Sequence, residues 1–290
     1  MNVGIFLFAT PYTAHPADVA IRAEALGFDS LWMGEHPVMP VSTSTPYPLT
    51  EDGTIPDFYG QLADPLIGLA TAAASTKKLK IGTGVCLVTE RDPIILAKEI
   101  ATLDHLSNGR VVLGVGSGWL KEEVEILGTS FSKRWVRLRE SIEAMRRLWT
   151  VEEASFHGQI IDFPPVRCNP KPVQKPHPPV LLGAHGEKGL RRVAAWADGW
   201  CPLAPGPQAL RKQLVTLRRY TEEAGRNFST LEISVFLGIR DKDPCADLIQ
   251  QYEDAGADRV VLMLGAESGA LAFRHVHFLE PQTVEGTLER

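Results

Sequence analysis

The sequence alternates short runs of β-branched and aliphatic residues with longer segments of helical periodicity, and this alternation continues along most of the chain. It predicts a strand followed by a helix as the repeating unit. Eight segments have the composition and length of strands: residues 3–8, 30–35, 79–87, 111–115, 179–183, 199–202, 231–237 and 259–264. Eight such units in order favour an α/β fold of the closed (β/α)8 type, a TIM barrel, over an open doubly wound sheet.

The segments between the strands carry the start and stop signals of helices. Seven helices are predicted, over residues 16–26, 65–75, 93–106, 133–149, 188–196, 208–224 and 244–255. Several begin with proline. Backbone N–H groups in the first turn of a helix have no partner within the helix, so a residue without an N–H loses no hydrogen bond there. Gly27, Gly225 and Gly256 follow three of the helices, where a left-handed residue closes the last turn. Each of these glycines precedes the next strand.

Two connections are too long for simple barrel loops: residues 37–62 after the second strand and residues 150–178 before the fifth. The first is rich in Pro, Ser and Thr, and we expect its aromatic residues to cover an apolar ligand. These residues are Tyr47, Phe58 and Tyr59. The second contains a predicted hairpin that turns at Gly158. We interpret both as insertions into one barrel domain that comprises residues 1–290.

Composition excludes several classes of protein. The hydrophobic content of 44% provides enough material for a continuous core. Basic and acidic residues, 30 and 35 of them, are interspersed, so we expect no nucleic-acid or membrane partner. The N-terminus enters an apolar strand directly, without the features of a signal peptide, and no apolar stretch is long enough to span a bilayer. The scattered cysteines, Cys86, Cys168, Cys201 and Cys245, show no metal-binding spacing. These features predict a reduced, cytoplasmic protein.

The residues that follow each strand of a TIM barrel lie at its mouth, where such enzymes hold their catalytic groups. Glu35 and His36 follow the second strand. A histidine at this place can exchange a proton with a substrate oxygen near neutral pH, while Glu35 tunes it or binds the edge of a cofactor. Position alone is also compatible with a surface histidine that caps a loop.

Glycines mark the third and fourth strands. Gly82 and Gly84 stand within the third, where glycine indicates a bulge or a close approach, made either by a flat ring or by a packed helix. Gly116 and Gly118, in VVLGVGSGW, allow a sharp turn at the mouth. Their spacing is out of register with the G-x-G-x-x-G pattern of dinucleotide-binding folds. We therefore do not expect a dinucleotide site at this turn.

The fifth strand leads into LLGAHGEKGLRR, where Gly183 and Gly186 open a helix. Backbone N–H groups at a helix N-terminus bind phosphate, and Lys188, Arg191 or Arg192 would reinforce such a site. The alternative is an ordinary glycine-containing turn.

Three missing patterns narrow the chemistry. The first strand does not end in H-x-H, as metal-dependent barrel hydrolases require, and the only H-x-H in the chain, His275 and His277, lies in the C-terminal tail. We expect no metal site. No strand ends on a lysine placed for a Schiff base, and no G-x-S-x-G motif occurs, which disfavours aldolase and serine-hydrolase chemistry.

Four segments together resemble the luciferase-like flavin and deazaflavin oxidoreductase family: GFDSLWMGEH, IGTGVCLV, DPIILAKEIATLDHLSNGRVVLGVGSGW and NPKPVQKPHPPVLLGAHGEKGLRRVAAWADGW. The resemblance extends over residues 3–264 and is greatest to the branch that uses coenzyme F420, a deazaflavin. It implies a TIM barrel that holds an isoalloxazine-like ring at its mouth, with a small organic substrate over the ring.

The same resemblance implies roles for particular residues. Glu35 and His36 match the acidic–histidine pair of the family, in which the histidine orients or protonates substrate during hydride transfer; many members have Asp where this chain has Glu35. The ring rests on a strand-three bulge that includes a cis peptide between non-proline residues. The implied cofactor-binding residues are Gly84 and Val85 at the bulge, Gly116 and Gly118 beside the ring, and Gly183, Ala184, His185 and Gly186 at the phosphate turn.

Three functions follow from the resemblance. The first is hydride transfer between F420 and an unidentified organic substrate, with His36 as the proton donor or acceptor. The second is an FMN-dependent monooxygenase, since FMN presents a phosphate to the same turn. The third is a barrel without catalytic activity. The F420 tail calls for additional basic residues, and Lys121, Lys133, Arg134 and Arg137 either serve it or form a solvated helix face.

Members of the family are commonly dimers, which implies a homodimer. Apolar helix segments such as LAKEIATLDHL either form the partner surface or face the barrel.

Overall fold

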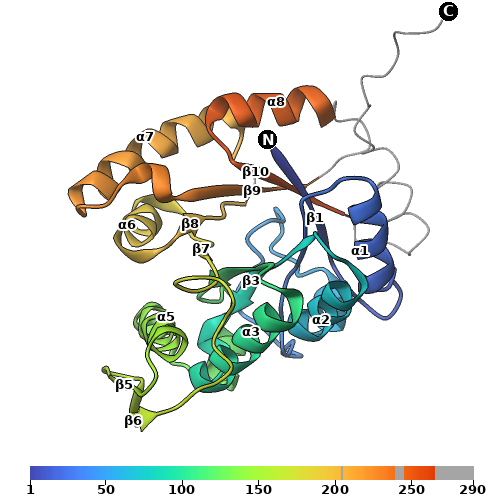
Figure 1. Cartoon of the computed structure of the whole chain (residues 1–290). Helices are drawn as coiled ribbons and strands as arrows, with labels where there is room; N and C mark the ends of the chain where they lie inside the picture. The colour runs from blue at the N-terminus through green and yellow to red at the C-terminus, as the bar shows by residue number, and fades with distance from the viewer. Residues whose placement is uncertain (204, 239–244, 265–290) are drawn as a thin grey trace, which may run out of the picture.

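The computed structural model describes residues 1–203, 205–238 and 245–264. Within them, eight parallel strands close into one barrel in the order β1-β10-β9-β8-β7-β4-β3-β2 (Figure 1). The strands are β1 (Asn2–Leu7), β2 (Ser30–Met33), β3 (Lys80–Leu87), β4 (Val111–Gly116), β7 (Val180–Leu182), β8 (Gly199–Trp200), β9 (Glu232–Gly238) and β10 (Arg259–Met263). The TIM barrel expected from the sequence is confirmed, and an open sheet is excluded.

Helices form a layer outside the strands (Figure 1). They are α1 (Pro16–Ala25), α2 (Pro65–Ser75), α3 (Pro93–Ser107), α4 (Lys121–Ile126), α5 (Arg134–Thr150), α6 (Gly186–Trp196), α7 (Pro207–Glu223) and α8 (Cys245–Ala255). The N-terminal prolines of α2 and α3 each follow an aspartate, Asp64 or Asp92, whose carboxylate accepts two backbone N–H groups of the first turn. Local sequence therefore determines where these two helices begin.

The second insertion forms an antiparallel hairpin of β5 (Ala154–His157) and β6 (Asp162–Val166), as predicted. The carboxylate of Glu140 on α5 accepts the backbone N–H groups of Gln159, Ile160 and Ile161, and it therefore fixes the turn of the hairpin to that helix. Because a segment between a helix and the next strand lies at the end of the barrel opposite the mouth, the hairpin does not cover the site (Figure 1). The first insertion contains the short helix η1 (Asp57–Gln61).

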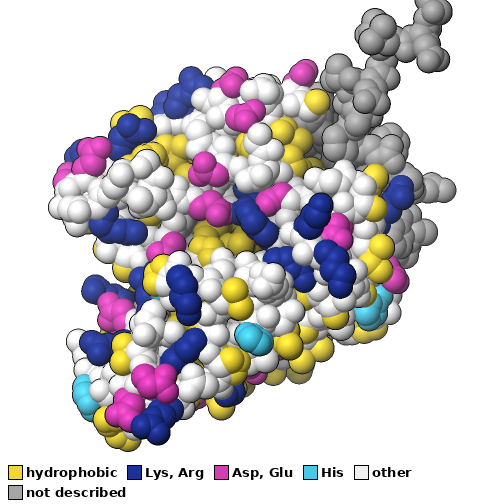
Figure 2. Space-filling model, viewed as in Figure 1, with side chains coloured by type: hydrophobic (Ala, Val, Ile, Leu, Met, Phe, Trp, Pro, Cys, Tyr) yellow, Lys and Arg dark blue, Asp and Glu magenta, His cyan; other side chains and the backbone are white. Residues whose placement is uncertain are grey.

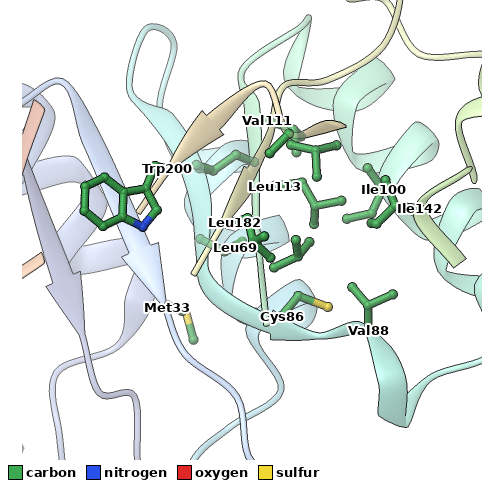
Figure 3. Packing of buried hydrophobic residues seen from close by; sticks show 14 of the residues in the cluster. Met33, Leu69, Cys86, Val88, Ile100, Val111, Leu113, Ile142, Leu182 and Trp200 are labelled. Atoms are coloured by element: carbon green, nitrogen blue, oxygen red, sulfur yellow. The ribbon is translucent and has the colours of Figure 1, made fainter. Parts of the chain in front are cut away.

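The core has two parts. A large cluster lies between the strands and the helices, where Ile100 of α3 and Ile142 of α5 face Leu113 of β4 (Figure 3). A smaller cluster includes Trp32 and Phe236. A Cβ atom at Gly82 would lie 2.4 Å from the Trp32 ring, so this glycine makes room for an indole of the protein itself, and neither a cofactor ring nor a packed helix is needed to explain it.

The apolar segment LAKEIATLDHL belongs to α3, and its residues Leu96, Ala97, Ile100 and Leu103 are buried. They face the barrel, so this segment is not an open partner surface. The exposed apolar residues of α3 are Ile95 and Leu106, and the homodimer stays a prediction.

Arg259 of β10 is almost completely buried and forms ion pairs with Asp29 and Glu232. These pairs connect β10 to β9 and to the start of β2, near the end of the barrel opposite the mouth. The buried cation therefore helps to close the barrel.

On the face drawn in Figure 2, lysine and arginine side chains are interspersed with aspartate and glutamate. No helix in the described ranges has both the length and the apolarity required to cross a membrane. The same part of the chain contains no cluster of His, Cys, Asp and Glu placed to hold a metal ion. His275 and His277 lie outside the described residues.

Candidate active site at the barrel mouth

A bulge in β3 forms the centre of the candidate site. The peptide bond between Gly84 and Val85 is cis, and the register between β3 and β4 shifts between Thr83 and Cys86. Gly84 and Val85 are partly exposed, whereas their neighbours on both sides are buried. The bulge thus presents backbone and one small side chain, as the sequence resemblance implies for the support of a flat ring.

Val85 also connects the glycines at the ends of two other strands. A Cβ atom at Gly116 would lie 2.6 Å from Cγ2 of Val85, and one at Gly183 would lie 3.0 Å from Cγ1. Larger residues at either glycine would displace Val85. Four of the predicted cofactor-binding residues, Gly84, Val85, Gly116 and Gly183, therefore come together at the barrel mouth.

His36, which follows β2, is held by two partners. Its Nδ1 lies 2.6 Å from Oε2 of Glu123, and the Trp119 indole donates its N–H to Nε2 over 3.3 Å. These partners assign the ring proton to Nδ1 and leave a lone pair on Nε2. Only 6% of the His36 side chain is exposed, so it is not a surface residue that caps a loop. The geometry gives the protein a proton acceptor at Nε2.

Glu35 faces a different set of neighbours. Its carboxylate accepts the backbone N–H of Leu87 at 2.9 Å and Nε of Arg91 at 2.6 Å, and only 1% of the side chain is exposed. Arg91 also binds Asp64 at the start of α2. Both oxygens of Glu35 are engaged, so its carboxylate positions the chain that follows the bulge, and its catalytic role stays a prediction.

An aromatic wall, made of Phe8, Tyr47, Phe58, Tyr59 and Trp119, borders His36. The His36 ring lies 5.1 Å from Tyr59 and 5.6 Å from Trp119, measured between ring centroids. Tyr47 contacts both Tyr59 and Trp119, and Phe58 stacks on Tyr59 at 4.6 Å. Phe8, at the end of β1, extends this series by its contact with Phe58. Of the three aromatic residues that the first insertion was expected to contribute, Tyr59 therefore contacts His36, and Tyr47 and Phe58 contact Tyr59.

Two neighbouring acids of α4 hold different parts of the site. Glu123, fully buried, binds His36. Oε1 of Glu122 accepts the backbone N–H and the hydroxyl of Ser44 and the backbone N–H of Thr45, and these hydrogen bonds lower the pKa of Glu122 to about 2. The first insertion is therefore fixed to the same helix as the partner of His36. Neither acid was predicted from the sequence to belong to the site.

A third acid, Glu90 in η2 (Val88–Glu90), is buried without a partner. Only 8% of the residue is exposed, and neither carboxyl oxygen makes a hydrogen bond. Burial, reinforced by the charges of Glu123 and Glu35, raises the pKa of Glu90 to about 9, so it is protonated at neutral pH. A Cβ atom at Gly118 would lie 2.7 Å from Oε1 of Glu90, and Gly118 has a φ of 75°. The positive φ and the nearby Glu90 both favour glycine at position 118, and its place beside the cofactor ring stays a prediction.

The predicted phosphate turn lies at the start of α6. His185 precedes the helix and makes no side-chain capping bond, so it does not occupy the first backbone N–H groups. Gly186 has a φ of 68°. Ala184 is buried, and its carbonyl accepts the indole N–H of Trp200. The bond from Trp200 therefore holds the buried side of the turn, while Gly186 and the N-terminus of α6 lie at the surface.

Arg192 of α6 and Arg134 of α5 lie against the same tryptophan ring, and neither has a carboxylate partner within the described part of the chain. The Arg192 guanidinium lies 4.1 Å from the centre of the Trp135 ring, and that of Arg134 lies 5.9 Å from the same ring. Burial, with a contribution from the charge of Arg192, lowers the pKa of Arg134. Arg191 is different, because it pairs with Glu187. Of the basic residues weighed from the sequence, Arg134 and Arg192 are the two that share the Trp135 ring, and neither makes an ion pair with a described carboxylate.

Comparisons with known proteins agree with this architecture. Residues 1–240 match the model of the luciferase-like monooxygenase family. The chain is 38% identical over 281 residues to an uncharacterised protein of Mycobacterium tuberculosis, which covers 96% of this chain and 97% of that protein. It is 32% identical over 212 residues to an F420-dependent glucose-6-phosphate dehydrogenase of Amycolatopsis mediterranei, which covers 71% of this chain and 59% of that protein.

Solved structures share the fold at low sequence identity. Monooxygenase RslO1 from Streptomyces bottropensis superposes with a TM-score of 0.75 at 21% identity, over 98% of both chains. An F420-dependent secondary alcohol dehydrogenase, solved with an F420–acetone adduct, superposes with a TM-score of 0.71 at 22% identity, over 90% of this chain and 92% of that chain.

Proposed function

Because the chain belongs to the luciferase-like monooxygenase family, whose members are oxidoreductases, we propose that it transfers a hydride between the deazaflavin coenzyme F420 and a small organic substrate. The F420-dependent relative at 32% identity supports this choice. We further propose that the protein is a cytoplasmic homodimer, as expected from the sequence and the family resemblance.

The observation that favours F420 over FMN is the pair Arg134 and Arg192, of which Arg192 belongs to the helix that begins at the phosphate turn; the two share the Trp135 ring and have no described carboxylate partner. FMN ends at its phosphate, whereas F420 continues into a lactyl group and an oligoglutamate tail with several carboxylates. Two guanidinium groups without carboxylate partners fit such a tail, because charge-assisted hydrogen bonds to carboxylates are the strong ones. Arg134 and Arg192 would therefore hold the tail.

The remaining residues of the site fit the other parts of the cofactor. Gly84, Val85 and Gly116 would support the ring, because the bulge offers a surface without large side chains. The N-terminus of α6, after Gly183 and Gly186, would bind the phosphate. Bound F420 would supply two-electron hydride chemistry.

The protein would supply proton transfer, orientation and exclusion of water. Nε2 of His36 accepts a proton from a substrate oxygen during oxidation and returns it during reduction. Glu123 stabilises the resulting imidazolium through Nδ1 and fixes the plane of the ring. The aromatic wall keeps water from the reacting atoms.

Parallel titration with F420 and FMN tests the proposal, with quenching of cofactor fluorescence as the signal. We expect tighter binding of F420. Replacement of both Arg134 and Arg192 by alanine should weaken F420 binding by about tenfold or more and leave FMN binding within about twofold, since only the tail contacts are lost. Arg139→Ala, an exposed arginine of α5 paired with Glu143, is the matched control.

Each outcome of the titration has a defined meaning. Tighter binding of FMN would support the flavin monooxygenase instead. Absence of binding to both cofactors would support a barrel without catalytic activity.

A further inference from the structure

The polar atoms of the aromatic wall are paired with one another. The hydroxyl groups of Tyr47 and Tyr59 are 2.6 Å apart and form a mutual hydrogen bond. The indole N–H of Trp119 is donated to His36. No cation–ring contact within the described residues involves this wall. A ligand beside the wall therefore meets mainly the carbon surfaces of these rings.

The charge behind the wall disfavours anionic ligands. Glu123 is a buried carboxylate, and its partner His36 is neutral in the tautomer assigned by its hydrogen bonds. Arg91, the arginine that follows the bulge, is already bound to Glu35, Asp64 and Glu99. The described side chains next to His36 thus carry a net negative charge in a setting of low polarity, where a phosphate or carboxylate group would be repelled.

The indole N–H of Trp119 is hydrogen-bonded to Nε2 of His36, the atom that a substrate oxygen has to reach. The indole nitrogen donates its hydrogen to the lone pair of His36 Nε2. The two nitrogens are 3.3 Å apart, which is long for a hydrogen bond of this kind. A hydroxyl group of a ligand could make a shorter bond to the same lone pair. The Trp119 ring is half-buried and contacts Tyr47, so the indole could give up this bond and still cover the ligand.

We propose that the substrate is a neutral, mainly apolar alcohol or the corresponding carbonyl compound, and that Trp119 determines this specificity by holding Nε2 of His36 until the substrate oxygen replaces its N–H. This inference rests on the proposed function and adds the substrate class to it. It separates this chain from its relatives named as glucose-6-phosphate dehydrogenases, whose substrate is a phosphorylated sugar.

The oxidation balances without any further reactant. The substrate loses its hydroxyl proton to Nε2 and a hydride from the carbinol carbon to oxidised F420, and the C–O single bond becomes C=O. His36 then carries the proton as an imidazolium paired with Glu123. In the reverse direction the same proton returns to the carbonyl oxygen.

Turnover of matched alcohols by the protein loaded with oxidised F420 provides the first test. The set comprises cyclohexanol, 1-phenylethanol, glucose and glucose 6-phosphate. The loss of absorbance of oxidised F420 measures the rate of turnover. We expect kcat/KM to be at least about a hundredfold higher for the two apolar alcohols than for glucose 6-phosphate, the discrimination expected when a charged group must be desolvated without a partner. Equal or faster turnover of glucose 6-phosphate would overturn the inference.

The indole N–H signal of Trp119 provides a second test, in protein without cofactor. Trp119→Phe identifies this signal in the nuclear magnetic resonance spectrum. Cyclohexanol should shift the signal in a saturable way, and glucose 6-phosphate should leave it in place. A signal that no neutral alcohol of the set moves would refute the role assigned to Trp119.

The same variant gives a readout that loss of structure would not produce. Trp119→Phe retains an apolar ring but frees Nε2, so we expect the KM for cyclohexanol to fall by about fivefold, the value of one neutral hydrogen bond, with kcat changed less. Trp196→Phe, on α6, is the matched control. An unchanged KM would contradict the displacement.

Failure of this inference and failure of the proposed function give different results. If F420 does not bind, the proposed function fails while the Trp119 signal still reports the response to alcohols. If F420 binds and neutral alcohols neither react nor move the signal, only the substrate class is wrong.

Discussion

Glu90 offers the sharpest test of the electrostatics of the site, through the substitution Glu90→Gln. The buried carboxyl has a pKa of about 9 in the folded protein, against an ordinary value of 4.5. Between these values the folded chain holds a proton that the unfolded chain releases. Since the folded pKa is the higher one, the free energy of unfolding is greatest below pH 4.5 and decreases as the pH rises toward 9.

The size of the effect follows from the difference in pKa. One unit corresponds to about 1.4 kcal/mol, so keeping this proton at pH 7 costs the folded state about 3 kcal/mol. Glutamine has a similar shape and cannot ionise. Its buried amide has a cost of its own, but that cost does not depend on pH. The quantity to compare is the free energy of unfolding of the variant minus that of the unaltered protein. We expect this difference to increase by about 4 kcal/mol between pH 5 and pH 8.

Urea unfolding at pH 5, 6, 7 and 8, followed by circular dichroism, measures this dependence. The control is Glu125→Gln on the exposed side of α4, which should give a profile parallel to that of the unaltered protein. Parallel profiles for Glu90→Gln and the unaltered protein would mean that Glu90 is ionised in the folded state. Three neighbouring carboxylates, those of Glu90, Glu123 and Glu35, would then repel one another, and a cation beyond the described contacts would be needed to stabilise them.

Three further substitutions test other parts of the structure. Gly82→Ala places a methyl group against the Trp32 ring and should cost about 1–3 kcal/mol, measured by urea unfolding; a cost near zero would contradict the tight packing. His36→Asn removes the proton acceptor and should lower kcat by about 10²–10⁴-fold without weakening F420 binding, and an unchanged kcat would exclude the role of His36 as a base. Arg259→Met leaves Asp29 and Glu232 without their buried cation and should cost about 3–5 kcal/mol in thermal unfolding, whereas a more stable variant would show that burial of the charge outweighs its pairing.

The fold was predictable because its signals are local. The alternation of strand and helix periods can be counted in the sequence, and aspartate–proline pairs mark two helix starts directly. Gly84 was predictable for a similar reason, since a glycine inside a β-branched run indicates a bulge. The resemblance to the luciferase-like family added the cis peptide, which no local signal indicates.

The partners of His36 were not predictable in the same way. Glu123 lies 87 residues further along the chain, and the segment KEEVEILG offers three acids without showing which one turns inward. Only the phase of α4 relative to the barrel selects Glu123. The contact between Glu90 and Gly118 was not predictable for a related reason, because the sequence does not show that these two segments lie against each other.

The arrangement of α4 connects the first insertion and the base of the site to one element. Ser44 of the first insertion and the imidazole of His36 are held by consecutive residues, Glu122 and Glu123, of one short helix. The segment that contributes Tyr47 and Tyr59 and the carboxylate that orients His36 therefore share a single support of six residues. A substitution that shifts this helix would disturb both at once.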